Sequence, residues 1–291
     1  MLSYQHGYHA GGPADVHKHA ALCLLMDRLI SKEKPFCAID LFAGEGVYDL
    51  DGDKAQKVKE FEKGISRLWP GENCPPALNK YFLIVKALNR RAALKSYPGS
   101  PAVLRAFLRD DDRLILNELH PSSFSALKKW AGRDKRIAVH KRDGLEALAG
   151  LVPPTIRRGL VLIDPSYEVK SEYTTIPVNL AKAVKKWPQG IFVLWYPILA
   201  EGRHKALTDG LLDKVETGIF HSEIELAAKR GRKPAQDAPE AGMLGSGVFV
   251  LNPPWQFDAA MADVGAWITK TMTGGAGHHK ASWLKRHADK E

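Results

Sequence analysis

Cysteine is scarce in this sequence, and its spacing argues against two common ways of stabilising a fold. The three cysteines are Cys23, Cys37 and Cys74, and no two of them stand in a Cys-x-x-Cys arrangement. An odd number of cysteines without that spacing favours neither a disulfide framework nor a cysteine zinc site. We therefore expect a protein of a reducing compartment with no bound metal.

Long apolar runs are missing as well. The N-terminus has no basic segment followed by an apolar one, and no stretch approaches the ~18 consecutive apolar residues of a membrane helix. The sequence therefore predicts a cytoplasmic protein that does not enter the membrane. No obligate protein partner is evident from its motifs, so a monomer is expected.

Length and charge set further bounds. A chain of 291 residues that is 45% hydrophobic can bury a full core, and it is long for one domain but short for two large ones. We expect one domain over residues 1–291, with an insertion in it. The chain has 42 Lys and Arg residues against 33 Asp and Glu residues, a net charge of +9, and this surplus favours a phosphate-rich partner.

Short apolar runs alternate with helical patterns along the chain. The expected strands are residues 37–42, 113–118, 137–141, 160–163, 191–196, 219–226 and 247–251. Apolar positions recur at three and four residues in the expected helices, which are residues 14–30, 121–131, 173–187, 200–215 and 257–271. This alternation predicts an α/β fold with a doubly wound, mostly parallel sheet of seven strands.

Two stretches depart from the alternation. Residues 50–98, between the first and second strands, have helical spacing and lead into the turn-forming string Tyr97-Pro98-Gly99-Ser100-Pro101, so an inserted helical subdomain is expected there. Residues 229–242 begin with the basic string Lys229-Arg230-Gly231-Arg232-Lys233. Such a run is most often a solvated loop, and contact with RNA phosphates is the alternative.

The first expected strand ends in a pattern typical of cofactor loops. Asp40 closes the strand, and Gly44 and Gly46 follow it in the spacing Asp-x-x-x-Gly-x-Gly. Glycine there lets a ligand approach the backbone closely. The spacing matches the S-adenosylmethionine loop of class I methyltransferases and lacks the third glycine of the dinucleotide fingerprint. An ordinary strand-to-helix turn is the alternative, because short glycine motifs have many false positives.

The next two strands also end in groups suited to this cofactor. Glu118 follows the second strand, where a doubly wound fold places the acid that binds the ribose hydroxyls. Asp143 and Gly144 follow the third strand, and a carboxylate beside glycine is expected to accept a hydrogen bond from the adenine amino group of the cofactor. Asp-Gly is also a very common turn, so the pair indicates a cofactor site only because it follows the third expected strand.

The fourth strand runs into Asp164-Pro165-Ser166-Tyr167, one letter from the Asp-Pro-Pro-Tyr signature of amino-group methyltransferases. An arylamine is a poor nucleophile because its lone pair is delocalised into the ring. Hydrogen bonds from its two hydrogens to the Asp164 carboxylate and the Pro165 carbonyl favour a pyramidal nitrogen aimed at the methyl sulfonium. Asp164 then removes or relays the proton, and Tyr167 stacks on the extruded base. A strand that ends in a plain proline turn is the alternative.

Several longer strings of the sequence resemble those of one family. They are Tyr4-Gln5-His6-Gly7-Tyr8-His9, Ala14-Asp15-Val16-His17-Lys18-His19, Tyr97-Pro98-Gly99-Ser100-Pro101, Glu118-Leu119-His120-Pro121, Arg157-Arg158-Gly159-Leu160, Leu194-Trp195-Tyr196-Pro197 and Asn252-Pro253-Pro254-Trp255. Over nearly its whole length the sequence resembles the RlmJ family of bacterial 23S ribosomal RNA adenine-N6 methyltransferases.

The resemblance implies a Rossmann-like class I fold, S-adenosylmethionine as cofactor, and methyl transfer to the N6 amine of an adenine in exposed, protein-free 23S rRNA. It implies, by motif position, a cofactor site lined by His19, Ser100, Glu118, Asp143, Gly144 and Asp164. It also implies that Asp164 is the catalytic acid-base residue and that Tyr4, His6 and Lys18 handle the RNA. Lys18 also fits, physically, a phosphate or adenine contact.

Two positions depart from the family pattern. Phe42 replaces a histidine after the first strand, and it is expected to stack on or pack against the cofactor without hydrogen-bonding to it. Ser166 replaces the second proline, so the restriction that proline places on the residue before it is lost, although the Pro165 carbonyl is kept. A slower enzyme is expected. The alternatives are a catalytically weakened RNA-binding protein with the same fold and a DNA adenine-N6 methyltransferase.

Two other groups of residues resemble functional sites. Asn252-Pro253-Pro254-Trp255 fits the amino-methyltransferase pattern, but it follows the seventh strand, away from the cofactor strand ends, so a strand-ending turn is favoured. Imidazoles and a thiol near the start of the first helix suggest a zinc site, but their spacing matches no compact zinc pattern. These are His6, His9, His17, His19 and Cys23.

Overall fold

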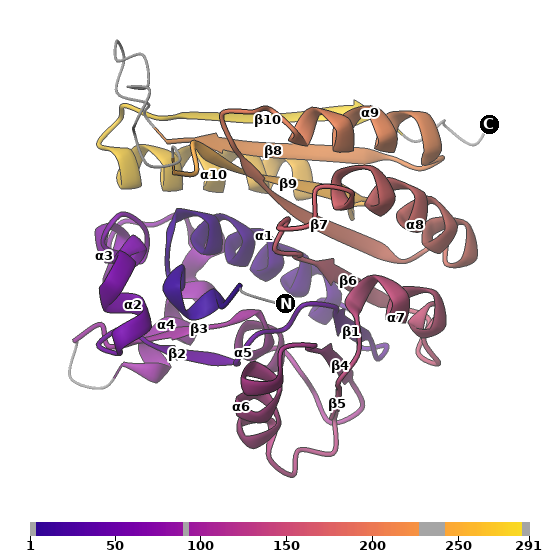
Figure 1. The fold of residues 1–291 in the computed structure, drawn as a ribbon, viewed down its shortest axis with the longest axis horizontal. Coiled ribbons are helices and arrows are strands. Elements are labelled where there is room, and N and C mark those ends of the chain that lie inside the picture. The colour runs from indigo at the N-terminus through magenta and orange to yellow at the C-terminus, as the bar shows by residue number, and fades with distance from the viewer. Residues whose placement is uncertain (1–3, 90–92, 227–241, 287–291) are drawn as a thin grey trace.

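The computed structural model describes residues 4–89, 93–226 and 242–286, and its centre is an eight-stranded sheet of order β10-β8-β9-β7-β6-β1-β4-β5 (Figure 1). The strands of this sheet are β1 (Cys37–Asp40), β4 (Arg113–Asn117), β5 (Ile137–His140), β6 (Gly159–Ile163), β7 (Ile191–Ile198), β8 (Ile219–Glu225), β9 (Gly245–Leu251) and β10 (His278–Lys285). Neighbouring strands from β5 to β7 pair in parallel. The pairs β7–β9, β9–β8 and β8–β10 are antiparallel.

The central strands are apolar along their whole length because both faces of the sheet are covered. Every residue of β1 and β6 is buried, as expected for parallel strands between two helical layers. Alternate residues enter different cores: Ala38 and Leu160 belong to one apolar cluster, whereas Ile39 and Val161 belong to the other. The sheet therefore separates two hydrophobic cores.

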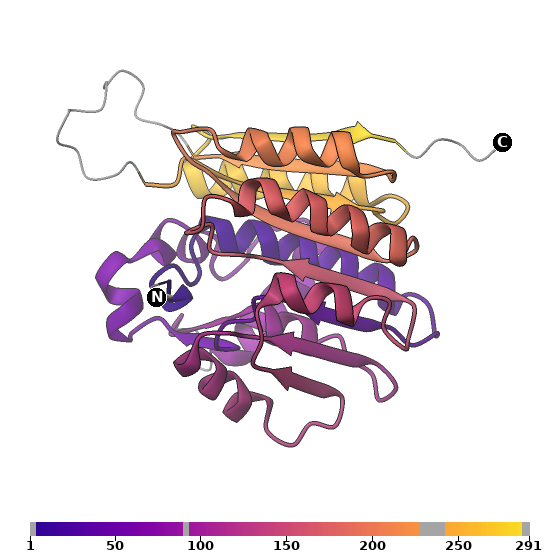
Figure 2. The same cartoon turned by 45° about the vertical axis from the view of Figure 1, so that its right-hand side comes forward.

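Helices form the two outer layers. The described α-helices are α1 (Pro13–Ile30), α2 (Asp53–Val58), α3 (Ile65–Leu68), α4 (Asn79–Leu88), α5 (Ser100–Arg105), α6 (Pro121–Ala131), α7 (Gly144–Leu151), α8 (Glu172–Lys186), α9 (His204–Lys214) and α10 (Phe257–Thr273). In Figure 2 the indigo α1 and the yellow α10 lie behind the sheet, and α7, α8 and α9 lie in front of it. None of the described helices combines the length and the apolar character that a membrane span requires.

The segment expected as an insertion holds α2, α3 and α4 between two short strands, β2 (Val47–Asp49) and β3 (Ser96–Pro98), which pair with each other. Its apolar side chains join the core on the α1 side of the sheet, where Phe82 meets Trp267 of α10 edge to face at 6.2 Å. That residues 50–98 form a subdomain of their own stays a prediction.

The expected α/β fold with a large, mostly parallel sheet is confirmed, with one correction to the strand count. All seven expected strands are present, and β10 is the eighth. It is an edge strand whose residues are half-buried or exposed, so it lacks the apolar run that marks the other strands. The helix expected at residues 200–215 begins at His204.

Candidate active site

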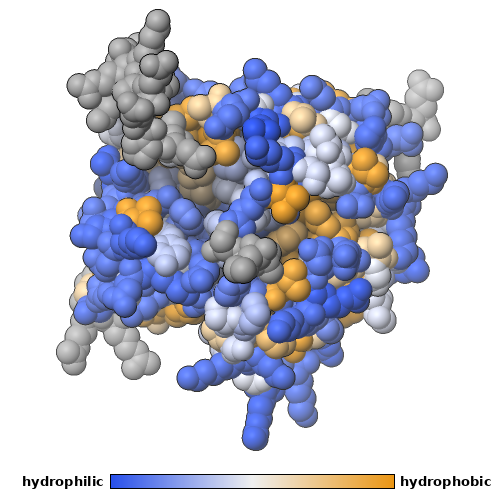
Figure 3. All heavy atoms as spheres, in the orientation of Figure 1, coloured by the Kyte–Doolittle hydropathy of each residue, from blue (hydrophilic) through white to orange (hydrophobic). Residues whose placement is uncertain are grey.

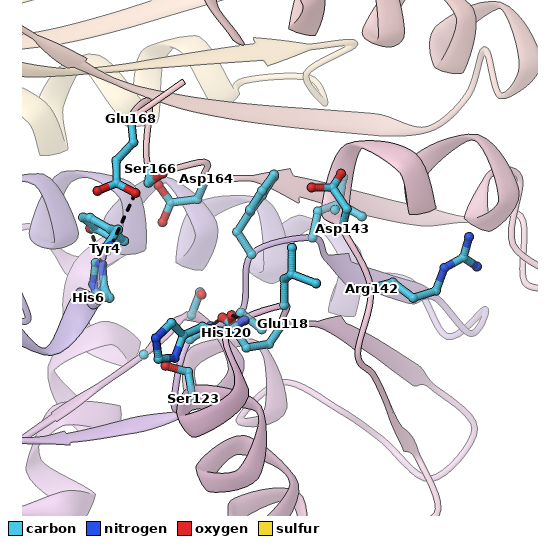
Figure 4. Close-up of a pocket in the computed structure, with 18 of the residues that line it drawn as sticks. Tyr4, His6, Glu118, His120, Ser123, Arg142, Asp143, Asp164, Ser166 and Glu168 are labelled. Atoms are coloured by element: carbon cyan, nitrogen blue, oxygen red, sulfur yellow. Dashed lines mark hydrogen bonds between the residues drawn. The ribbon is translucent and has the colours of Figure 1, made fainter. Parts of the chain in front are cut away.

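A cavity of about 460 Å³ opens at the carboxyl ends of β1, β4, β5 and β6 (Figure 4). This is the edge where doubly wound sheets bind ligands, and the volume suits a small-molecule site. The lining residues predicted from the sequence are Tyr4, His6, Lys18, Phe42, Gly44, Ser100, Glu118, Asp143, Gly144 and Asp164. Segments from seven parts of the chain thus converge on one space.

Two glycines keep the cofactor side of the cavity open. Gly44 has φ +67°, and a Cβ at this position would lie 2.1 Å from the Tyr48 hydroxyl. A Cβ on Gly144 would lie 2.4 Å from the carbonyl oxygen of Leu41 and 2.9 Å from the Phe42 ring. Side chains at either position would displace the walls of this cradle, so the strand-end loops fit a ligand that contacts backbone.

Carboxylates at the ends of β4 and β5 are held by backbone groups. Glu118 accepts hydrogen bonds from the N–H of Gly44 (2.8 Å) and of His120 (2.6 Å), which fixes its carboxylate between two loops. Burial raises the pKa of Glu118. Asp143 caps α7 by accepting from the N–H of Glu146 at 3.0 Å. Both side chains line the cavity, and their contacts with a ribose and an adenine amino group stay predictions.

Asp40 lies beneath this cradle without lining it. The side chain is fully buried, one oxygen accepts from the N–H of Phe42 at 3.2 Å, and Oδ2 has no hydrogen-bond partner among the described residues. Burial raises the pKa of Asp40 to about 7, although a hydrogen bond from Ser100 opposes the shift. A buried acid with an unused oxygen is costly for a fold and is typical of a ligand site.

A buried ion-pair network lies at the side of the cavity that Asp164 lines. Lys18 of α1 is 3% exposed, and its ammonium contacts Asp15 at 2.9 Å and Oδ2 of Asp164. Burial lowers the pKa of Lys18, but the two carboxylates outweigh it and the net pKa is raised. Asp15 is 1% exposed, and its net pKa lies well below normal because His6 and Lys18 outweigh its burial.

The N-terminal segment is joined to the same network. His6 Nε2 lies 2.9 Å from Oδ2 of Asp15, and His6 Nδ1 lies 2.9 Å from the Tyr4 hydroxyl. The backbone N–H of Tyr4 donates to Glu168 at 3.4 Å, across the cavity mouth (Figure 4). A continuous polar chain therefore runs from Tyr4 to Asp164.

Three residues with predicted roles in binding are buried: Tyr167, Lys18 and His19. Tyr167 is 7% exposed: its ring lies 4.6 Å from that of Tyr173, and its hydroxyl donates to the carbonyl of Trp195 at 2.6 Å. A ring packed in this way does not line the cavity, so the stacking of Tyr167 on a base stays a prediction.

Lys18 and His19 are also buried, and their contacts with RNA and with the cofactor stay predictions. The ammonium of Lys18 is buried between two carboxylates, although the side chain lines the cavity, so little of it is exposed for the phosphate or adenine contact expected from the sequence. His19 is fully buried and outside the cavity lining, where its Nδ1 lies 3.0 Å from the Tyr97 hydroxyl. It supports the wall from behind.

Gly46 and Pro165 are next to the cavity and outside its lining, while Ser166 lines it. The Gly46 carbonyl accepts from the N–H of Gly99 at 2.7 Å, so Gly46 ties the cofactor loop to the turn before α5. The basic string Lys229–Lys233 lies outside the described residues.

Both rival sites lose support. In the described ranges no group of three or more His, Cys, Asp or Glu side chains is placed to hold a metal ion. The imidazoles have separate partners: His9 pairs with Glu60 at 2.9 Å, and His17 with Ser222 at 2.9 Å. Asn252 follows β9, which is antiparallel to β7, so it lies at the opposite edge of the sheet.

Sequence reasoning missed several residues that line the cavity and one, Asp15, that lies behind its wall. Asp15 stood inside a quoted family string, but no local pattern marked it as the residue that joins His6 to Lys18. Arg142 directly precedes Asp143 and lines the mouth, as do the exposed Val169 and the half-exposed Leu119. The only sequence signal for Arg142 and Leu119 was that each is adjacent to a predicted site residue, Asp143 or Glu118.

Comparisons with known proteins agree with this geometry. A family model described as "RsmJ: Ribosomal RNA large subunit methyltransferase D, RlmJ" matches residues 33–285. The Ribosomal RNA large subunit methyltransferase J of Escherichia coli K12 is 40% identical over 98% of this chain and 99% of its own length. The protein of the same name from Haemophilus influenzae is 36% identical, with coverages of 98% and 99%.

A solved structure is similar over the same extent. The crystal structure of a Legionella pneumophila protein of the DUF519 family superposes with a TM-score of 0.85 at 31% identity, covering 97% of this chain and 99% of that one. The family match, the full-length relatives and the shared fold agree. The chain belongs to the RlmJ family of ribosomal RNA large subunit methyltransferases.

Proposed function

We propose that this chain transfers a methyl group from S-adenosylmethionine to the N6 amine of an adenine in 23S rRNA. The single observation that carries the proposal is Asp164: its carboxyl lies at the carboxyl end of β6, lines the cavity, and is held on one side by a buried ammonium. The cradle around Gly44, Glu118 and Gly144 adjoins it, as a site for cofactor and target base together requires.

The residues of the chain supply positioning and proton transfer. When bound, S-adenosylmethionine supplies an electrophilic methyl group. Lys18 holds Oδ2 of Asp164, and Oδ1 takes no hydrogen bond from the described residues, so it is available to accept from the adenine amine. The Pro165 carbonyl is the proposed second acceptor, and Asp164 receives the proton that the amine loses.

The cofactor residues act as fixed acceptors and spacers. Glu118, already held by two backbone N–H groups, is proposed to bind the ribose hydroxyls, and Asp143 the adenine amino group. Asp40 and Ser100 are proposed to shape the floor of the site, and Phe42 to pack against the cofactor. Tyr4 and His6, at the cavity mouth, are the proposed contacts to the target base.

A cytoplasmic, monomeric protein acting on ribosomal RNA is part of the same proposal. The test is methyl transfer to deproteinised 23S rRNA with the methylated base mapped by mass spectrometry. We expect one adenine to carry N6-methyl. Tight cofactor binding without transfer would favour the weakened RNA-binding protein, and preferred methylation of competing duplex DNA would favour a DNA methyltransferase.

Ser166 offers an internal test of the same reaction. Ser166→Pro restores the family motif and restricts the backbone of Pro165, whose carbonyl is the proposed acceptor. We expect kcat to rise by roughly two- to tenfold with the cofactor affinity unchanged, since a better-held acceptor lowers the barrier. Equal rates for the two proteins would show that Ser166 does not limit the enzyme.

A further inference from the structure

One short segment of the described chain carries a large positive charge. Residues 128–142 hold seven Lys and Arg residues and a single acid, Asp134, a net charge of +6 in a chain whose total is +9. The segment comprises the last turn of α6, the loop after it, β5, and the residues that lead into α7. No other described element carries a comparable excess.

Most of this charge is unpaired. Asp134 binds Arg136 at 2.8 Å and Arg105 at 3.3 Å, which uses the only acid in the segment. The other six cations are exposed and form no ion pair within residues 4–89, 93–226 and 242–286. We call them the basic strip: Lys128, Lys129, Arg133, Lys135, Lys141 and Arg142.

The strip leads to the active site. α6 begins at the cavity, which His120 and Ser123 line, and runs toward the opposite edge of the sheet. β5 returns along the outer edge and ends just before Arg142, which lines the cavity and whose side chain extends away from the other labelled residues in Figure 4. At ~3.3 Å per residue, Lys135 and Arg142 are separated by about 20 Å.

The strip is also accessible. β5 is the last strand of the sheet, so nothing in the described part of the chain pairs with its outer edge. Figure 1 places α6 and the loop before β5 at the bottom of the molecule, and Figure 3 shows hydrophilic side chains projecting there. Lys141 lies with its ammonium 6.0 Å from the Phe124 ring centre, which holds one cation near the mouth.

We propose that the basic strip binds the phosphate backbone of the RNA that flanks the target adenine. The inference rests on the proposed function, since it assumes RNA as the substrate. Ammonium and guanidinium groups on an exposed edge neutralise phosphates without reading sequence, and such contacts set the position of a nucleic acid on its protein. With phosphates ~3.4 Å apart along a stacked strand, a strip of about 20 Å spans about six of them.

Structural roles explain only part of this charge. Lys128 and Lys129 lie in the last turn of α6, where cations stabilise a helix, and charges beside an edge strand discourage pairing with other chains. Those roles need one or two cations. They do not account for six, nor for a strip that ends at the lining of the active-site cavity.

The test removes three charges distant from the cavity. In the full chain, Lys129, Arg133 and Lys135 are each changed to Gln. The matched control changes Lys182, Lys185 and Lys186 of α8 to Gln, which removes the same charge from the other face of the sheet. Binding of a deproteinised 23S rRNA fragment is followed by fluorescence anisotropy at several salt concentrations, and methyl transfer is measured alongside.

We expect the strip variant to bind RNA on the order of tenfold more weakly at ~0.15 M salt, with a slope of log K against log salt reduced by about 2. KM for RNA should rise equally, whereas kcat at saturating RNA and the cofactor affinity should change less than twofold. The α8 control should match the parent. Equal affinities and equal slopes for both variants would overturn the proposal.

The outcome also separates this proposal from the proposed function. If the parent transfers no methyl group yet the strip variant loses RNA affinity relative to the α8 control, the basic strip stands and the proposed reaction falls. If the parent methylates rRNA and the strip variant behaves like the control, the reaction stands and the strip falls.

Discussion

Asp40 and Asp112 lie at opposite edges of the same sheet, and both are fully buried. Asp112, just before β4, accepts from the N–H of Phe36 at 2.9 Å and from Arg109 at 2.8 and 2.9 Å. Burial raises its pKa, but these hydrogen bonds outweigh burial and the net pKa is lowered. Asp40, at the end of β1, keeps an unpartnered oxygen and a pKa raised to about 7.

This difference distinguishes buried polar groups that stabilise the fold from buried polar groups that are available to a ligand. At the amino edge the polar groups are satisfied from within: the Asn252 amide donates to the carbonyls of Pro188 (3.2 Å) and Gly190 (3.3 Å). At the carboxyl edge a buried acid keeps an unused oxygen, and Asp164 faces an open cavity. A fold tolerates such costs where a ligand repays them.

The largest expected effect is a loss of activity in only one of the two Pro-containing motifs, the one that begins at Asp164 and not the one that begins at Asn252. Asp164→Asn removes the proton acceptor, and we expect kcat to fall by about a thousandfold or more. Asn252→Ala, at the amino edge, should leave kcat and KM within twofold. Both are measured by methyl transfer to deproteinised rRNA below the unfolding temperature of either variant. A larger loss for the Asn252 variant would move the active site to the other edge.

The next effect tests positioning by the buried network. Asp15→Asn weakens the hold on Lys18 and His6, so the Asp164 carboxyl loses its fixed place. We expect kcat to fall on the order of 10- to 100-fold, because a misplacement of about 1 Å is enough for such a loss. Cofactor affinity, measured by calorimetry, should change less than threefold.

Asp112→Asn is the control for the Asp15 variant, because Asp112 is equally buried but lies at the edge away from the cavity. It should lower stability and leave kcat within twofold at a temperature where it is folded. Equal rate losses for both variants would mean that Asp15 acts only through stability.

A third prediction compares the pH dependence of stability at the two aspartates. The folded-state pKa of Asp40 is about 7 against an ordinary 3.8, so its burial costs nothing below pH 3.8 and progressively destabilises the fold as pH rises toward 7. The full shift corresponds to about 4 kcal/mol at most. In urea unfolding of the cofactor-free protein, Asp40→Asn should therefore gain stability over the parent between pH 5 and pH 8.

Asp112 should show the opposite sign. Its folded-state pKa is lowered, so its stabilisation is present above its ordinary pKa and is lost as pH falls through the folded value. Asp112→Asn should cost roughly 2–3 kcal/mol at pH 7 and less near pH 3, since charge-assisted hydrogen bonds are removed. Parallel pH profiles for the two variants would contradict the contrast between the edges.

The sequence predicts the sheet and the positions of the acids at its strand ends because both depend on local patterns. Strands covered on both faces are continuous apolar runs, and Asp40, Glu118 and Asp143 each follow such a run directly. β10 and the Asp15 network depend on contacts between distant segments. The half-exposed residues of β10 have the pattern of a loop. Asp15 can join the network of Lys18 and Asp164 only because α1 lies beside the end of β6 in the fold.

Tyr167 shows a further limit. Its place in the motif predicts an aromatic ring next to Asp164, which is correct, but the letters do not tell which way the ring points. Tyr167 has φ +57°, and its ring turns into the core beside Tyr173 and Trp195. Only the fold around the motif decides between stacking on a base and anchoring a loop.

The smallest expected effects concern Tyr167 and Trp255, the aromatic residues that end the two Pro-containing motifs. Tyr167→Phe keeps the ring and removes the hydroxyl that donates to Trp195, so we expect a loss of about 1 kcal/mol in the free energy of unfolding and a few-fold fall in kcat. Trp255, 79% exposed, should change stability by less than ~0.5 kcal/mol when replaced by Ala. Urea midpoints and initial rates measure both. Stacking on the base would need only the ring, so an unchanged kcat and stability in Tyr167→Phe would support that role, whereas losses in both show that the hydroxyl anchors the catalytic loop to β7.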